Sequence, residues 1–197
     1  MNKLPFEQRT YKVVTKKKAA TDKELGCKPD ERTTEELIHN GIINLNKPAG
    51  PTSQQTVSYV KNILKTNKAG HSGTLDPNVS GVLPIALDKA TRIVQATLNA
   101  GKEYICLMHL HKDIPKSKIK EAFPKLIGKI TQLPPLRSAV KREERQREIY
   151  YLKILEIDQR DILFKVGSEG GTYIRRLCQQ IGQEMGTNAH MQQLIRT

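Results

Sequence analysis

One short segment of the sequence gathers the residue types that could carry out a reaction. Residues 68–77 read Lys-Ala-Gly-His-Ser-Gly-Thr-Leu-Asp-Pro, which places a histidine and an aspartate among glycines and a proline. Glycine permits unusual backbone angles, and Pro77 fixes the chain directly after the carboxylate. The segment therefore predicts an irregular, shaped loop that presents Asp76 rigidly. On its residues alone Asp76 is only a candidate, because an aspartate in such a turn more often bonds to its own backbone.

Other catalytic or cofactor-binding patterns are weak. His71 precedes Asp76 by five residues, which raises a metal site or a catalytic triad, but no third ligand cluster and no G-x-S-x-G elbow accompany it. Residues 167–171 are rich in glycine but lack the spacing of phosphate-binding loops. The three cysteines are scattered and form no C-x-x-C pair, so a zinc site is not supported. We therefore expect no metal ion.

The charge balance favours a polyanionic partner. The chain of 197 residues carries 33 Lys and Arg against 20 Asp and Glu, a formal net charge of +13. Nucleic acid is the leading candidate partner for such a positive field, although a membrane surface would favour the same composition. No apolar stretch approaches the run of roughly 18 residues that a membrane span needs, and the first residues lack the features of a secretory signal. We expect a soluble, cytoplasmic protein.

Strands are expected in four places. Residues 41–45 form a short apolar run before a turn, and residues 104–111 are rich in strand formers. Residues 149–157 and 162–166 predict two further strands joined as a hairpin. Because no clean βαβ repeat is present, we predict an α+β fold with a mixed or antiparallel central sheet flanked by helices and loops.

Three segments predict helices by the spacing of their apolar residues. The first follows a cap at Thr52 or Ser53, the second runs from a cap at Ser117 to residue 125, and the third covers residues 173–185 and ends at Gly186. The side chains that we expect to face the core are Val57, Val60, Ile63 and Leu64 in the first helix, Ile119, Ala122, Phe123 and Leu126 in the second, and Ile174, Leu177, Cys178 and Ile181 in the third.

The first 40 residues differ from the rest of the chain. They are polar, contain a run of three lysines at residues 16–18 and show little apolar periodicity. We interpret residues 1–40 as an N-terminal extension, either a partly ordered tail or a tail that grips RNA, and residues 41–197 as one domain.

Four ordered motifs resemble a known family. Residues 70–77, Gly-His-Ser-Gly-Thr-Leu-Asp-Pro, closely resemble the catalytic loop of pseudouridine synthases of the TruB/dyskerin type. Residues 46–53 (Asn-Lys-Pro-Ala-Gly-Pro-Thr-Ser), 101–104 (Gly-Lys-Glu-Tyr) and 171–175 (Gly-Thr-Tyr-Ile-Arg) resemble three further motifs in the family's order. Residues 134–142, Pro-Pro-Leu-Arg-Ser-Ala-Val-Lys-Arg, are similar to the archaeal and eukaryotic branch, the catalytic subunit of H/ACA ribonucleoproteins, and most similar to its archaeal form. Residues 186–197 at the C-terminus resemble the same branch.

The resemblance implies an enzyme that isomerises uridine to pseudouridine in ribosomal or transfer RNA without a cofactor. Asp76 would be the essential carboxylate, Tyr104 would stack against the extruded base, and Arg175 would pair with the carboxylate. Lys47 and Pro48 match a motif that supports the loop, while His71 and Leu194 match residues near the extruded nucleotide. Lys47, His71 and Leu194 are expected among the residues that bind the substrate RNA. The remaining expected site residues are Lys141 and Arg142 for binding RNA, and Gly73, Thr74 and Pro77 for shaping the motif.

The resemblance also implies partners and a missing part. A guide RNA, a substrate RNA and three small accessory proteins are expected, with a nucleolar location if the source is eukaryotic. Family members continue past the position of Thr197 into a PUA domain, so we expect a catalytic domain that is incomplete at its C-terminus, either as a fragment or as a reduced enzyme. A non-catalytic RNA-binding scaffold with the same fold stays open as an alternative, although the presence of Asp76, Tyr104 and Arg175 favours an enzyme.

Overall fold

The computed structural model describes residues 3–18, 22–134, 141 and 143–197, and its centre is one mixed sheet. The strand order is β1-β3-β8-β4-β7-β6-β5, with β2 paired to β3. This confirms the α+β class and the mixed sheet. The strands are β1 (Ile42–Lys47), β2 (Ala69–His71), β3 (Ser80–Leu87), β4 (Lys102–Leu110), β5 (Gly128–Gln132), β6 (Arg145–Asp158), β7 (Asp161–Ser168) and β8 (Ala189–Arg196).

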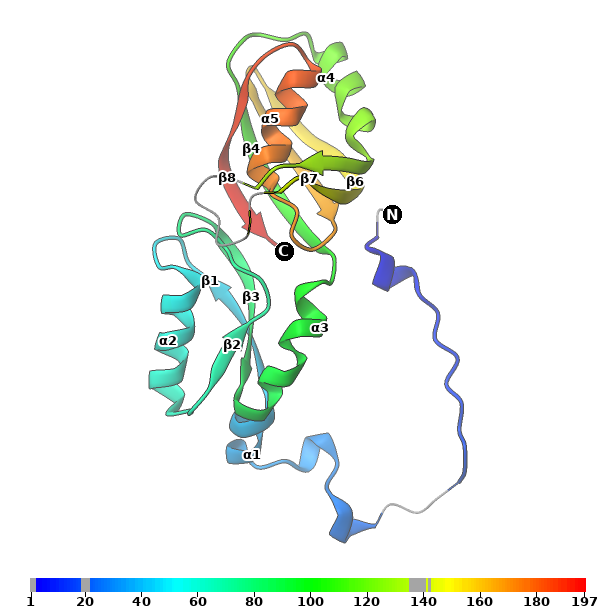
Figure 1. Cartoon of the computed structure of the whole chain (residues 1–197), viewed down its shortest axis with the longest axis vertical. Coiled ribbons are helices and arrows are strands. Elements are labelled where there is room, and N and C mark those ends of the chain that lie inside the picture. The colour runs from blue at the N-terminus through cyan, green and yellow to red at the C-terminus, as the bar shows by residue number, and fades with distance from the viewer. Residues whose placement is uncertain (1–2, 19–21, 135–140, 142) are drawn as a thin grey trace.

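A narrow junction divides the sheet into two lobes (Figure 1). β3 and β8 run parallel and pair only at Ser80 with Ile195 and at Gly81 with Arg196, whereas the other strand pairs are antiparallel. A side chain at Gly81 would overlap the backbone of Arg196, so only glycine permits this approach. The lower lobe holds β1 to β3 and the upper lobe holds β4 to β8, and the C-terminus lies where they meet (Figure 1).

Helices cover both lobes. In the lower lobe α2 is capped by Thr52, whose hydroxyl accepts the amide N–H of Gln55 while the Gln55 side chain bonds back, and this confirms the predicted cap. The helices are α1 (Thr34–Asn40), α2 (Ser53–Leu64), α3 (Val94–Leu98), α4 (Lys116–Ala122) and α5 (Ile174–Glu184), with short 3-10 turns η1 (Pro5–Gln8), η2 (Lys23–Leu25), η3 (Pro29–Glu31), η4 (Asp88–Ile93) and η5 (Phe123–Leu126).

The apolar faces pack as the spacing predicts, with two corrections. Ile174, Leu177, Cys178 and Ile181 of α5 are all buried, and Gly186 takes the positive φ of 76° that ends the helix. Ile63 is 77% exposed because it lies in the last turn of α2, at the edge of the buried stripe. The second helix begins at Lys116 after Pro115, so Ser117 is not its cap.

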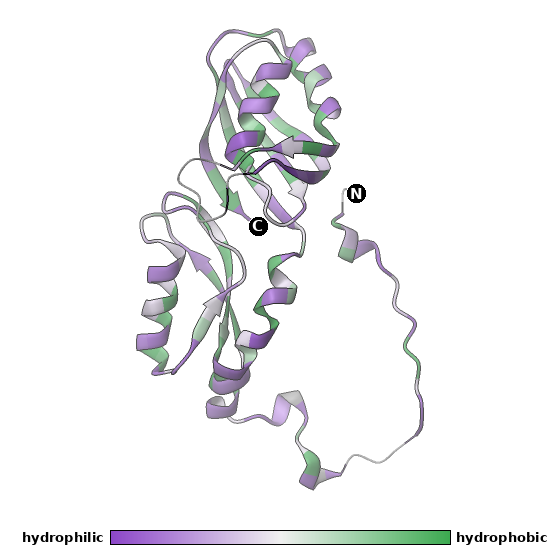
Figure 2. Ribbon diagram, viewed as in Figure 1, coloured by the Kyte–Doolittle hydropathy of each residue, from purple (hydrophilic) through white to green (hydrophobic). Residues whose placement is uncertain are grey.

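Four strands were not expected from the sequence. They are β2, β3, β5 and β8, and β2 takes up part of the loop that was expected at residues 68–77. The strands carry much of the hydrophobic surface that forms the core (Figure 2). None of the helices described is long and apolar enough to cross a membrane.

The N-terminal segment touches the fold at its two ends. Leu4 is buried, and its side chain lies beside Gly101 at the start of β4. Residues 9–18 are exposed and without regular structure. Farther along the chain, residues 22–33 lead through η2 and η3 to α1 below the lower lobe (Figure 1). The predicted RNA-binding Arg142 and most of residues 134–142 lie outside the described residues.

Candidate active site

The segment that follows β2 is held in shape by α2 and β3. The hydroxyl of Ser53 donates to the carbonyl of Leu75 at 3.0 Å and accepts its amide N–H at 2.8 Å. The amide of Ser72 donates to the carbonyl of Pro84 at 3.1 Å, and Leu75 and Val79 are buried. These contacts fix the loop on both sides of Asp76, whose side chain remains about half exposed.

Lys47 supports the same loop from below. Its side chain is fully buried, and its ammonium donates to the carbonyls of Pro48, Pro51 and Pro77 at 2.7, 2.8 and 3.1 Å. All three protons are committed, and burial lowers the pKa of the group. Lys47 therefore positions the catalytic loop, and its assignment among the RNA-binding residues is wrong because no N–H is left to reach a phosphate.

Arg196 ties the loop to the sheet, and the sequence did not single it out. Its side chain is buried at the β3–β8 junction, where Nε donates to the carbonyl of Val82 at 2.6 Å and Nη2 donates to the carbonyl of Gly73 at 3.2 Å. Gly73 has a φ of 110°, and a Cβ there would lie 3.3 Å from the guanidinium. The only signal in the sequence was the place of Arg196 within a family-like segment at the C-terminus.

An ion pair joins the two lobes above the junction. Arg175, in the first turn of α5, donates through Nη2 to Oδ2 of Asp76, which is 99 residues away in the sequence. Both side chains are about half exposed, so the ion pair is accessible from solvent. An arginine in this place orients the carboxylate and compensates its charge.

Gln132 positions the start of α5, and sequence reasoning missed it. Its buried side-chain amide accepts the N–H of Tyr173 at 3.0 Å and donates to the carbonyl of the same residue at 3.2 Å. This contact anchors the residue directly before the helix to the end of β5. Arg175 thus reaches Asp76 from a fixed helix end.

A cavity of about 450 Å³ lies beside the ion pair. Tyr104 lines it from β4 and is buried, which raises the pKa of the phenol. Apolar side chains from α3, α5 and β8 complete the walls: Leu98, Ile174, Met191 and Leu194. A largely apolar cavity of this size, with a carboxylate and an arginine at its mouth, suits a flat polar ring such as a nucleobase.

Lys102 adds a cation to the cavity. Its ammonium donates to the carbonyls of Thr97, Leu98 and Ala100 at 3.1, 2.7 and 2.7 Å, at the C-terminal end of α3. Burial and the neighbouring Arg196 lower the pKa of Lys102 to about 8. The lysine therefore holds the wall formed by Leu98 while it is protonated.

The structure brings together most of the expected residues. Asp76, Tyr104, Arg175, Leu194, Gly73 and Thr74 all line the cavity, while Pro48 and Pro77 give their carbonyls to Lys47. His71 does not line it: it is half-buried on β2, and burial and Arg196 lower its pKa. Lys141 is exposed, pairs with Glu143 and is not part of the cavity wall. In the part of the chain that is described, no group of three or more metal-ligating side chains is present.

Comparisons with known proteins converge on one family. The model of the TruB family pseudouridylate synthase N-terminal domain matches residues 61–174, and the DKCLD domain model matches residues 1–57. The chain is 54% identical to the "Probable tRNA pseudouridine synthase B" of Methanopyrus kandleri over 195 residues, which are 99% of this chain and 57% of that protein. The protein of the same name from Pyrococcus abyssi is 55% identical, over 98% of this chain and 58% of its own length.

Two solved structures share the fold. The crystal structure of a Cbf5-Nop10-Gar1 complex superposes with a TM-score of 0.93 at 52% identity, over all of this chain and 60% of the other. The structure of an H/ACA RNP bound to a substrate RNA containing 2'-deoxyuridine superposes with a TM-score of 0.84 at 50% identity, over 94% of this chain and 55% of the other. The chain thus spans somewhat more than half the length of the relatives that it matches.

Proposed function

Because the chain belongs to the TruB family of pseudouridylate synthases, we propose that it isomerises uridine to pseudouridine in RNA. The observation that carries the proposal is the ion pair of Asp76 with Arg175 at the mouth of a cavity lined by Tyr104. A uridine that is stacked in RNA cannot reach this carboxylate, so the nucleotide must be extruded into the cavity.

The reaction conserves all atoms of the nucleoside. The bond between N1 of uracil and C1′ of ribose breaks, a bond between C5 and C1′ forms, and the proton of C5 is replaced by one on N1. Asp76 faces the opening, where it attacks or deprotonates the nucleoside, and Arg175 holds the carboxylate in one orientation. Tyr104 and Leu194 hold the detached uracil while it turns, because the apolar walls exclude water around the ring.

In this proposal, a guide RNA selects the target uridine by base pairing. The solved relatives include an H/ACA RNP with a substrate RNA and a Cbf5-Nop10-Gar1 complex, which supports a guide RNA and small protein partners for this chain as well. A net charge of +13 suits a protein that binds the phosphate backbone of RNA while base pairing with the guide RNA selects the target sequence. Residues 1–40 would act as an extension of the catalytic domain, and a cytoplasmic location is part of this proposal.

The proposal is tested by measuring pseudouridine in a uridine-containing RNA incubated with the chain, with and without a matching guide RNA and accessory proteins. Product that depends on the guide supports the assignment to an H/ACA particle, and product without it supports a stand-alone enzyme. Salt-sensitive RNA binding with no product under any of these conditions would instead identify a non-catalytic scaffold.

A further inference from the structure

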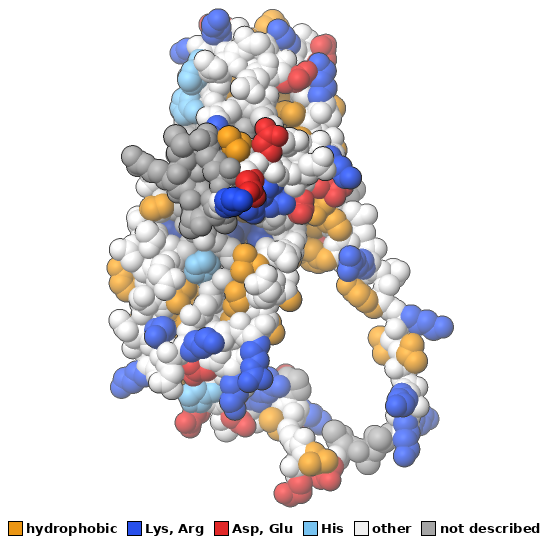
Figure 3. All heavy atoms as spheres, in the orientation of Figure 1, with side chains coloured by type: hydrophobic (Ala, Val, Ile, Leu, Met, Phe, Trp, Pro, Cys, Tyr) orange, Lys and Arg blue, Asp and Glu red, His pale blue; other side chains and the backbone are white. Residues whose placement is uncertain are grey.

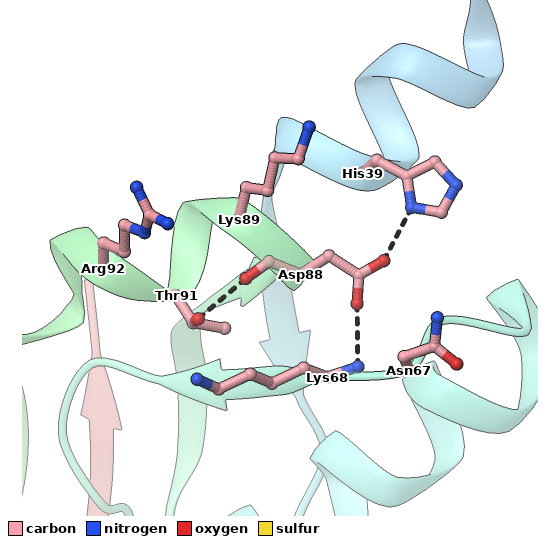
Figure 4. A pocket seen from close by; sticks show the side chains of 7 residues that line it. All are labelled: His39, Asn67, Lys68, Asp88, Lys89, Thr91 and Arg92. Carbon is pink, nitrogen blue, oxygen red and sulfur yellow. Dashed lines mark hydrogen bonds and ion pairs between the residues drawn. The ribbon is translucent and has the colours of Figure 1, made fainter.

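A second cavity, of about 420 Å³, lies at the end of β2 that points away from the catalytic loop. Three segments that are distant in the sequence line it: the end of α1 with His39, the start of β2 with Lys68, and η4 with Asp88, Lys89 and Arg92 (Figure 4). The catalytic mechanism uses none of these side chains.

Asp88 holds the framework of this cavity together. Its Oδ2 lies 2.7 Å from Nδ1 of His39, and its Oδ1 accepts the backbone N–H of Lys68 at 2.7 Å. Its own backbone N–H donates to the carbonyl of Lys68 at 2.7 Å, and it adopts a φ of 38°, which is unusual for a residue other than glycine. The hydrogen bonds with His39 and with the backbone of Lys68 lower the pKa of the carboxyl group. Both carboxylate oxygens of Asp88 are therefore hydrogen-bonded within the protein, to His39 and to the backbone of Lys68.

Three cations remain available around the opening. Lys68, Lys89 and Arg92 are exposed, and among the described residues no carboxylate forms an ion pair with any of them. In Figure 4 the dashed lines reach Asp88, its backbone and His39, but not the head groups of these three side chains. Among the side chains that line the cavity, three cations lie against one carboxylate that is already bonded. The carboxylate of Glu35 lies 4.0 Å from His39, and with it included the balance of charge is still positive.

The helix α3 connects this cavity to the active site. η4 continues directly into α3, whose Leu98 forms part of the catalytic cavity. The strand β3 runs from the junction at Ser80 to Leu87 beside Asp88 and spans roughly 25 Å, about seven base steps of a stacked strand. Lys and Arg side chains also gather over this end of the lower lobe (Figure 3).

We propose that this cavity, the cationic pocket of Lys68, Lys89 and Arg92, binds a backbone phosphate of an RNA strand whose uridine occupies the catalytic cavity. The inference rests on the proposed function, because it takes the ligand to be RNA. A phosphate seated here fixes the register of the strand along α3 and adds affinity without reading sequence.

The test is RNA binding by the full chain as a function of salt. The pocket variant combines Lys68→Gln, Lys89→Gln and Arg92→Gln, and the control variant combines Lys116→Gln, Lys118→Gln and Lys120→Gln on α4 in the other lobe. The two variants have the same net charge and change only exposed side chains. The bond of Asp88 to the backbone N–H of Lys68 survives the substitution, and thermal unfolding of both variants verifies the fold.

A short single-stranded RNA containing uridine serves as the probe, titrated by fluorescence anisotropy at several salt concentrations. We expect the pocket variant to bind more weakly and to lose about 1 from the slope of log K against log salt, while the control keeps the slope of the unchanged chain. Equal losses in both variants would overturn the proposal, since they would reflect net charge alone, and so would an unchanged slope in the pocket variant or no binding by the unchanged chain. Pseudouridine is measured separately, so a failure of catalysis with pocket-specific binding would refute the proposed function alone.

Discussion

The buried Lys47 offers a test of how the catalytic loop is held. Replacement by Met keeps an unbranched, slightly shorter side chain but leaves the carbonyls of Pro48, Pro51 and Pro77 without their donor. Leaving a carbonyl without its donor costs about 1 to 3 kcal/mol. We use the lower value of about 1 kcal/mol for each of the three carbonyls, because the prolines that carry them are exposed or half-exposed. The three carbonyls together give an expected loss of about 3 kcal/mol in the free energy of unfolding. The variant no longer buries an ammonium group, which is a second reason to use the lower value for each carbonyl.

A loss of this size lowers the midpoint of thermal unfolding by roughly 6 to 12 °C for a chain of this length. Catalysis should fall by about 100-fold at temperatures where the Lys47→Met variant is still folded, because a small displacement of Asp76 spoils its alignment. Calorimetry and single-turnover pseudouridine formation measure the two effects, with Lys116→Met on α4 as the control for loss of one positive charge. Stability within about 0.5 kcal/mol of the unchanged protein, together with full activity, would refute the role assigned to Lys47.

Three further predictions follow from the site. Arg175→Lys keeps a positive charge but loses the planar fork, so turnover should fall by at least about tenfold in single-turnover assays while the midpoint of urea unfolding changes little; equal turnover would contradict the role of the ion pair with Asp76. Because Lys102 is protonated below its pKa of about 8, activity should fall as the pH rises through that value, and Lys102→Arg should remove the fall; an identical pH profile in the variant would exclude Lys102 as its cause. Gly81→Ala should cost more than about 3 kcal/mol in urea unfolding, because the added Cβ overlaps the backbone of Arg196, and a loss below about 1 kcal/mol would show that the junction of β3 and β8 can relax.

The parts of the fold that could be predicted are those encoded by local patterns. α5 repeats its apolar residues at helical spacing and ends at Gly186, and its whole face is buried as expected. β3 was missed because Gly81 and Pro84 interrupt its strand formers, although Pro84 is accommodated opposite Asn44 of β1. β8 lacks a run of β-branched residues, and it is a strand because it pairs with β4.

The same distinction applies to the site. Asp76 could be found because its motif is continuous in the sequence, whereas Arg196 acts on Gly73 over a separation of 123 residues that no local pattern encodes. Gln132 likewise contacts Tyr173 across 41 residues. Lys47 was found by its motif, but its burial could not be predicted, because it depends on the packing of Pro51 and Pro77 around the side chain. That burial is the reason why Lys47 supports the loop and does not bind RNA.

The most direct test of the proposed chemistry compares the unchanged chain with Asp76→Asn in a pseudouridine assay that contains the guide RNA and accessory proteins. Asparagine preserves the size of the side chain and removes the charge, and Asp113→Asn at an exposed position serves as the control. We expect product from the unchanged chain and from the control, and none above background from Asp76→Asn, while all three bind the RNA equally. Undiminished product from Asp76→Asn, or no product from the unchanged chain, would contradict the assignment of Asp76 as the catalytic carboxylate.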